Sequence, residues 1–123
     1  YAAFPDAIRG GSRGYRLMRE LVRRGAECTI FTSDSNHLTD SPELTDDSLV
    51  RDVDGVTVCW LRTRKYSGAR SIRRVVSWFD FERQLLRLRK QPFGRPDVVI
   101  ASSLSLLSII SGLWFKMQFG CRL

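Results

Sequence analysis

The sequence predicts an α/β fold built on a parallel sheet, with helices on both faces and an inserted β-hairpin. Segments of helical periodicity alternate along the chain with runs of β-formers such as "ECTIFTS" and "DVVIASS". The second run is continuously apolar, as strands buried within a parallel sheet are. Between these runs, Asp54-Gly55 separates two short β-like segments and is a strong hairpin signal. Right-handed crossovers are expected to connect the parallel strands.

The length and charge of the chain limit its size class and its partners. With 123 residues, 43% of them hydrophobic, it can bury one core and form one domain or part of one. Its net charge of +7 comes mainly from arginine and favours anionic partners such as phosphates, nucleic acid or an acidic membrane surface. A doubly wound sheet normally begins with a strand, but the first segment here reads as a loop. We therefore expect residues 1–123 to be an incomplete domain whose first strand is missing.

The three cysteines, Cys28, Cys59 and Cys121, lie far apart within apolar runs. No C-x-x-C or Cys/His spacing is present, so no metal site is predicted. Buried, reduced thiols are the expected state, and they favour a reducing, cytoplasmic setting.

The N-terminal part of the chain is expected to contain one helix and one strand. Residues 1–11 read as a loop because a proline and a glycine pair interrupt them. Ser12 is a favourable N-cap for a helix from about residue 13 to residue 24, and Gly25 is a stop signal. A strand over residues 27–33 follows. The predicted apolar face of the helix consists of Leu17, Met18, Leu21 and Val22.

The central part is expected to contain the hairpin and a long helix. A polar, acidic loop is predicted over residues 34–48, and the two hairpin strands over residues 49–55 and 56–63. A basic loop over residues 64–70 then leads into a helix at about residues 71–90.

This long helix mixes one apolar stripe with many arginines. The stripe expected to face the sheet consists of Ile72, Val75, Val76 and Phe79. Trp78 and Phe81 lie away from it, so the sheet is not expected to cover all of the aromatic side chains. Aromatic tips beside arginines suit the headgroup layer of a membrane. An anionic membrane surface is therefore a predicted partner, and a solvated amphipathic helix with its arginines in water is the alternative.

Residues 97–103 are predicted to form a buried parallel strand, and residues 104–119 a helix that stops at Gly120. The helix opens with about twelve apolar residues, fewer than the roughly twenty that cross a bilayer. It carries one face of small residues, Ser105, Ser108, Ser111 and Gly112. We therefore expect it to pack closely on the sheet, and "FGCRL" to begin a further strand.

A glycine pair before the first helix is the main candidate binding feature. In open α/β sheets, ligands bind beyond the carboxyl ends of the strands. Gly10 and Gly11 stand in such a loop next to the Ser12 N-cap, where free N–H groups and the positive helix end suit a phosphate. Arg9 and Arg13 flank the pair. An ordinary glycine-rich turn would contain the same residues, so this feature alone does not decide the function.

Two other functional classes stay open. Gly11 and Gly14 match the last two glycines of G-x-G-x-x-G, and Asp34 follows the next strand, where a dinucleotide-dependent oxidoreductase has its ribose-binding acid. Arg9 occupies the first glycine position, which counts against this match. The other class is a non-catalytic basic module that binds membrane or nucleic acid. Because the sequence has no helix-turn-helix, zinc or RNA-recognition signature, nucleic acid is not a predicted partner.

Three ordered segments resemble family 4 glycosyltransferases of the GT-B fold. The segment "RGGSRGYRLMRELVRRGAECTIFTSDSNHLT" is similar to the start of that family, in which a GG loop leads into a helix and a strand that ends in "TS". The segments "VDGVTVCWLRTRKYSG" and "RPDVVIASSLSLLSIISGLWFKMQFGCRL" are similar to the subgroup that resembles fucosaminyltransferases of surface-polysaccharide assembly. Ala26, Cys28 and the "SSLS" segment depart from the family pattern.

The resemblance implies a Rossmann-like, acceptor-side N-terminal domain of a retaining, metal-independent sugar transferase. A nucleotide sugar would be the donor substrate, with no separate cofactor, and a polysaccharide or lipid-linked saccharide the acceptor. A second domain would hold the donor, so residues 1–123 alone are expected to be inactive. The enzyme would be cytoplasmic, peripheral at the inner face of the cell membrane.

The predicted substrate-binding residues lie at the carboxyl ends of strands or beside the first helix: Gly10, Gly11, Arg13, Asn36, His37, Ser102 and Ser103. The glycine pair matches the family's loop next to the donor diphosphate and acceptor, and the arginine is included for its position and charge. The Asn-His pair often occurs in the subgroup and would lie on the acceptor side, and an ordinary exposed loop histidine is the alternative. The two serines end the last predicted strand on the same rim. Catalytic residues are not predicted within this chain.

Overall fold

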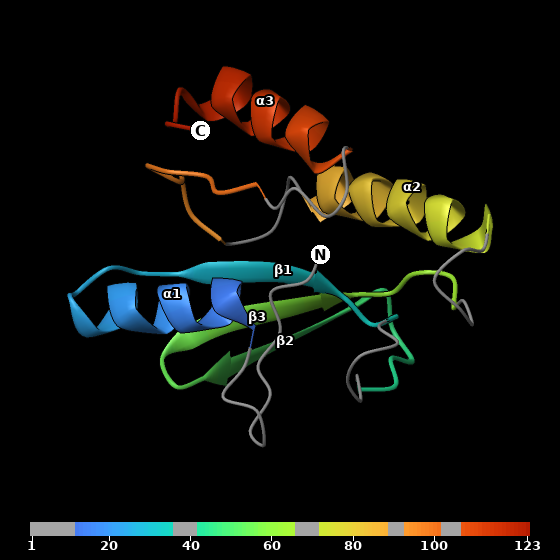
Figure 1. Ribbon diagram of the computed structural model, residues 1–123, viewed down its shortest axis with the longest axis horizontal. Coiled ribbons are helices and arrows are strands. Elements are labelled where there is room, and N and C mark those ends of the chain that lie inside the picture. The colour runs from blue at the N-terminus through green and yellow to red at the C-terminus, as the bar shows by residue number, and fades with distance from the viewer. Residues whose placement is uncertain (1–11, 36–41, 66–71, 89–92, 102–106) are drawn as a thin grey trace.

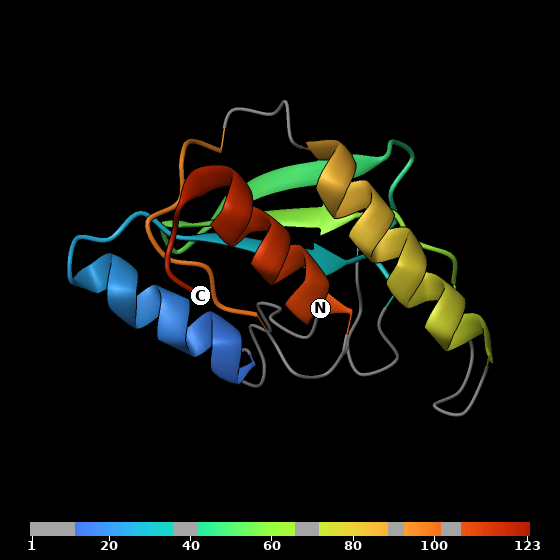
Figure 2. The same ribbon diagram turned by 90° about the horizontal axis from the view of Figure 1, so that it is seen from above.

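The computed structural model describes residues 12–35, 42–65, 72–88, 93–101 and 107–123 (Figure 1). They form the helices α1 (Arg13–Arg23), α2 (Ile72–Arg87) and α3 (Ser108–Phe119), and the strands β1 (Thr29–Ser33), β2 (Ser48–Val53) and β3 (Val56–Leu61). The α/β class predicted from the sequence is confirmed. The sheet has the order β1-β3-β2, with α1 on one face and α2 and α3 on the other (Figures 1 and 2).

The sheet is mixed, as expected for a parallel sheet with an inserted hairpin. β1 pairs with β3 in parallel, with Ile30 opposite Val58, and β2 pairs with β3 antiparallel. The predicted hairpin turn is confirmed, because Asp54 and Gly55 both have positive φ, 53° and 80°. Two such residues form the turn whose twist matches that of the flanking strands.

Both ends of α1 follow the sequence signals. The Ser12 side chain accepts a hydrogen bond of 3.3 Å from the N–H of Tyr15 and so caps the first turn. At the other end Gly25 adopts a φ of 90° and its N–H donates to the carbonyl of Val22 at 2.9 Å. This closure is typical of helices that end at a left-handed glycine.

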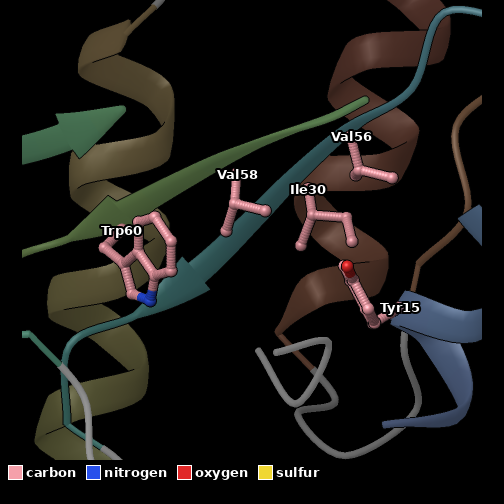
Figure 3. Close-up of a cluster of buried hydrophobic side chains, with 5 residues drawn as sticks. All are labelled: Tyr15, Ile30, Val56, Val58 and Trp60. Carbon is pink, nitrogen blue, oxygen red and sulfur yellow. The ribbon is translucent and has the colours of Figure 1, made fainter. Parts of the chain in front are cut away.

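The first hydrophobic cluster lies between α1 and the sheet and contains Tyr15, Ile30, Val56, Val58 and Trp60 (Figure 3). The predicted face of α1 is partly wrong, because Tyr15 is buried whereas Leu17 is 46% exposed. Tyr15, Met18 and Val22 recur at i, i+3 and i+7, and together they form the stripe that meets this cluster.

The second cluster lies on the opposite face and contains Cys59, Leu61, Phe81 and Leu85. The predicted orientation of the long helix is wrong. Its inward stripe is Ser77, Phe81 and Leu85, at i, i+4 and i+8, whereas Phe79 is 59% exposed. A helix presents one such stripe to a sheet, and the small Ser77 lets the backbone of α2 approach. Phe81, expected away from the sheet, is therefore buried.

The segment 97–101 forms one parallel bridge, between Val98 and Arg122. Val99 N–H donates to the Arg122 carbonyl at 2.8 Å, and Arg122 N–H to the Asp97 carbonyl at 2.9 Å. The predicted burial of this strand is wrong for Val98 and Ile100, which are each 58% exposed. Among the described residues the segment has a single bridge and belongs to no larger sheet, so these two side chains lack the neighbours of a buried strand.

α3 begins at Ser108, later than the predicted start at residue 104, and residues 102–106 lie outside the described ranges. The small-residue face is confirmed at Ser111 and Gly112, which are buried. A Cβ atom on Gly112 would lie 2.7 Å from Leu123 Cδ1, so a larger residue there would require the Leu123 side chain to shift. The helix therefore packs closely on the segments around 97–101 and 121–123.

The three cysteines are free. Cys59 and Cys121 are buried and Cys28 is half-buried, as expected for reduced core thiols. Burial raises the pKa of the Cys59 thiol to about 11 and raises that of Cys28 as well. Neither side chain is therefore a thiolate near neutral pH.

Candidate functional site

The carboxyl ends of β1 and β3 meet at one rim of the sheet, because the two strands run in parallel (Figure 1). Residues 34–35 follow β1 there, and residues 62–65 follow β3. α1 runs back along the sheet, so its N-terminus points toward the same end of the molecule (Figure 1). This rim is the place where an α/β sheet binds its ligands.

Asp34 is the centre of a buried polar network at the rim. Its side chain is 1% exposed, and its Oδ2 lies 3.0 Å from Lys65 Nζ. Its Oδ1 accepts hydrogen bonds from the N–H of Thr63 at 2.8 Å and from the Thr63 hydroxyl at 3.3 Å. Each polar atom of this buried carboxylate is thus paired, which is what burial of a charge requires.

Two hydroxyl groups extend this network. Ser33 Oγ and Thr63 Oγ1 lie 2.6 Å apart, and Ser33 Oγ also accepts from the N–H of Ser35 at 3.0 Å. Lys65 Nζ in turn donates to the Asp34 carbonyl at 2.8 Å. The ends of the two strands are therefore joined by side-chain hydrogen bonds beyond the last pair of the ladder, which holds the rim in one geometry.

A pocket of about 600 Å³ opens beside this network. Its walls come from the segment before β2, the segment after β3 and the exposed side of α2. The lining residues are Asp34, Glu43, Leu44, Asp47, Arg62, Thr63, Arg64, Lys65, Asp80, Arg83 and Gln84. All but one of these side chains are polar, so the pocket suits a hydrophilic ligand.

Charges of both signs line the pocket. Four of the lining residues are basic and four are acidic. Arg64 Nε lies 3.4 Å from Asp80 Oδ2, and Arg62 donates to the Thr45 carbonyl at 3.0 Å. Donors and acceptors thus stand side by side, an arrangement that can bind a hydroxyl group, which donates and accepts at once.

The structure describes only one of the seven predicted site residues. Arg13 is exposed in the first turn of α1 and does not line the pocket. The other six lie outside the described ranges: Gly10, Gly11, Asn36, His37, Ser102 and Ser103. Whether they share the rim is therefore still a prediction.

Sequence reasoning missed most of the residues that build the rim. From the sequence, Asp34 was considered only as a candidate ribose-binding acid, and Thr63 and Lys65 were not predicted as site residues. The structure shows the Asp34 carboxylate bound to those two residues and shielded from solvent, which counts against the ribose role. A partial signal was present, because polar residues follow both predicted strands, but the parallel pairing that brings them to one rim was not predicted.

Glu82 is a second buried carboxyl group, at the contact between α2 and α3. The Ser111 hydroxyl donates to Glu82 Oε2, and Oε1 has no hydrogen-bond partner within the described ranges. Burial raises the pKa of Glu82, and the hydrogen bond from Ser111 opposes this effect. The group does not line the pocket, so we assign it to the packing of the two helices.

Comparison of the chain with protein-family models, with curated proteins and with solved structures gave no match. Within the described ranges, no cluster of three or more histidine, cysteine or acidic residues has a geometry that could hold a metal ion. None of the helices in those ranges has the length and hydropathy of a membrane-spanning segment.

Proposed function

We propose that this chain is the acceptor-side domain of a nucleotide-sugar-dependent glycosyltransferase with the GT-B fold. The sequence segments that resemble family 4 enzymes motivate the proposal. The structural observation that supports it best is the pocket at the rim, which arginine and carboxylate side chains line together beside the ends of parallel strands. Saccharide hydroxyl groups are ligands that such mixed surfaces bind.

The rim residues would bind and orient the acceptor. Asp47 and Arg83 are both exposed and line the pocket from two different elements, the segment before β2 and α2. A carboxylate would accept from one sugar hydroxyl while a guanidinium donates to another. Asp34, Thr63 and Lys65 would act indirectly, since their mutual hydrogen bonds fix the floor of the pocket.

The donor would be bound mainly by a second domain, as the family resemblance implies. Such a transfer requires donor and acceptor to be held together in a cleft, so residues 1–123 alone should show no transfer above a blank. The predicted contribution of this domain to the donor side is the loop of Gly10 and Gly11 before the Ser12 cap. Backbone N–H groups at the start of α1 would stabilise the diphosphate that leaves.

The test is a titration of the ¹⁵N-labelled chain with a panel of neutral mono- and disaccharides, followed by NMR. Amide signals of Thr63, Arg64 and the segment 43–47 should move, and Asp47→Asn and Arg83→Gln should weaken the response by about tenfold each. Arg51→Gln, an exposed arginine on β2 away from the pocket, is the matched control. If no sugar of the panel moves these signals, the acceptor role is wrong.

The same titration with NAD distinguishes the oxidoreductase alternative. Shifts around Asp34 with NAD and none with sugars would replace the transferase proposal. In the longer protein that would contain both domains, Gly11→Val should abolish sugar transfer because a branched side chain blocks the approach of the phosphate. Wild-type rates in that variant would show that the glycine pair is only a turn.

A further inference from the structure

The outer side of the α2–α3 layer carries apolar side chains that no other described element covers. α3 is apolar on most of its surface, but only Ser111 and Gly112 are buried among its residues. The exposed apolar side chains of α3 are Ile109, Ile110, Leu113 and Met117, the last of them 87% exposed. A helix that is apolar all round is normally buried all round, so this face has the character of a contact surface.

α2 extends the apolar surface on the same side of the sheet. The two helices lie next to each other when seen from above (Figure 2) and are joined by the hydrogen bond from Ser111 to Glu82. Phe81 and Leu85 of α2 point into the core, so Val75, Phe79 and Leu86 face outward.

The charges on this layer are of one sign at the surface. Arg87 and Lys116 are exposed. The two helices contain only two acidic residues: Asp80, which is paired with Arg64, and Glu82, which is buried. Apolar side chains are thus interspersed with cations on a face where these helices offer no exposed carboxylate.

We infer that the outer face of α2 and α3 binds an anionic membrane surface, with Phe79, Leu113 and Met117 in the interfacial layer. Apolar side chains gain from leaving water there, and neighbouring cations are attracted to acidic headgroups. A second copy of the same face would place like charges opposite each other, which disfavours self-association as the role of this surface. The inference stands independently of the proposed sugar transfer.

Co-sedimentation of the 123-residue chain with vesicles is the test. One set consists of phosphatidylcholine alone and the other of phosphatidylcholine with phosphatidylglycerol. Binding should require the anionic lipid and weaken as salt is added, because exposed charges are screened. Arg87→Gln and Lys116→Gln should each lower the partition coefficient about fivefold. Arg16→Gln and Arg51→Gln, two exposed arginines outside this layer, should leave it unchanged.

The contribution of apolar side chains to membrane binding is tested with a matched pair of leucines. Leu113 is 48% exposed on α3, and Leu17 is 46% exposed on α1 at the opposite side of the sheet. Leu113→Gln should lower the partition coefficient about tenfold, whereas Leu17→Gln should not change it. Circular dichroism confirms that each variant is folded.

Three outcomes would overturn the inference: equal binding to both vesicle types, equal effects of Leu113→Gln and Leu17→Gln, or no binding at low salt. A dimer in light scattering that Leu113→Gln dissociates would assign the face to self-association instead. None of these results bears on the saccharide titration, so failure of one proposal is distinguishable from failure of the other.

Discussion

The phenol of Tyr15 donates a hydrogen bond of 2.7 Å to Asp54 Oδ2 and so joins α1 to the turn of the β2–β3 hairpin. The ring itself is buried in the first cluster against Ile30 and Val56 (Figure 3). Asp54 therefore has two roles, since it also adopts one of the two left-handed conformations of the turn. The helix and the hairpin are far apart in sequence, and this contact fixes their relative position.

Tyr15→Phe is expected to lower the free energy of unfolding by about 1–2 kcal/mol, because a hydrogen bond to a charged acceptor is lost while the ring stays in place. Urea unfolding measures the change. In an Asp54→Gly background, where glycine tolerates the positive φ, the same substitution should cost almost nothing. An equal cost in both backgrounds would show that the hydroxyl contributes through other contacts.

The ionisation of Tyr15 should make the protein less stable in alkali. Burial, together with the hydrogen bond to Asp54, raises the pKa of this phenol to about 12 from 10.0. As the pH rises, Tyr15 therefore loses its proton at a lower pH in the unfolded chain than in the folded protein. The free energy of unfolding should then fall as the pH rises from about 10 to about 12. Ultraviolet titration of the folded protein measures the pKa. Tyr15→Phe should remove this part of the pH dependence.

Glu82 predicts a second pH dependence, in weakly acidic solution. Because burial raises its pKa, the folded protein binds this proton more tightly than the unfolded chain does. Stability should therefore fall as the pH rises from the ordinary glutamate pKa through the raised value. Glu82→Gln should flatten this part of the profile.

Thr63→Val tests the network at the rim. The substitution preserves shape, but it removes the hydroxyl partner of Ser33 and one of the donors to Asp34. A cost of about 1–3 kcal/mol is expected from the polar groups left unpaired. Thr63→Ser keeps the hydroxyl and should recover most of the loss in urea unfolding. Valine and serine variants of equal stability would mean that packing alone matters there.

Local signals in the sequence predicted the elements better than they predicted the contacts. The Ser12 cap, the Gly25 stop and the Asp54-Gly55 turn were all correct, because each depends on the chemistry of a few neighbouring residues. The inward faces of α1 and α2 were partly or wholly misassigned. Tyr15 is buried on α1 where Leu17 was expected, and Phe81 is buried on α2 where Phe79 was expected. Periodicity alone does not say which of two overlapping stripes meets the sheet.

The polar rim was harder still to predict. Asp34, Thr63 and Lys65 come from segments that follow different strands, and only the parallel pairing of β1 with β3 brings them together. The pocket depends in addition on Asp80 and Arg83, from a helix whose orientation was predicted wrongly. A long-range pairing register is not encoded in any single short window of sequence.

Strand pairing occurs at two separate places among the described residues: the three-stranded sheet and the single bridge between Val98 and Arg122. Within the described ranges, side chains connect the two, among them the edge-to-face rings of Phe31 and Phe93, whose centroids are 5.1 Å apart. We therefore expect these two parts to unfold as separate cooperative units. Amide hydrogen exchange should therefore show β3 protected by global unfolding, while the amide of Val99 exchanges through a cheaper, local opening that leaves the sheet intact.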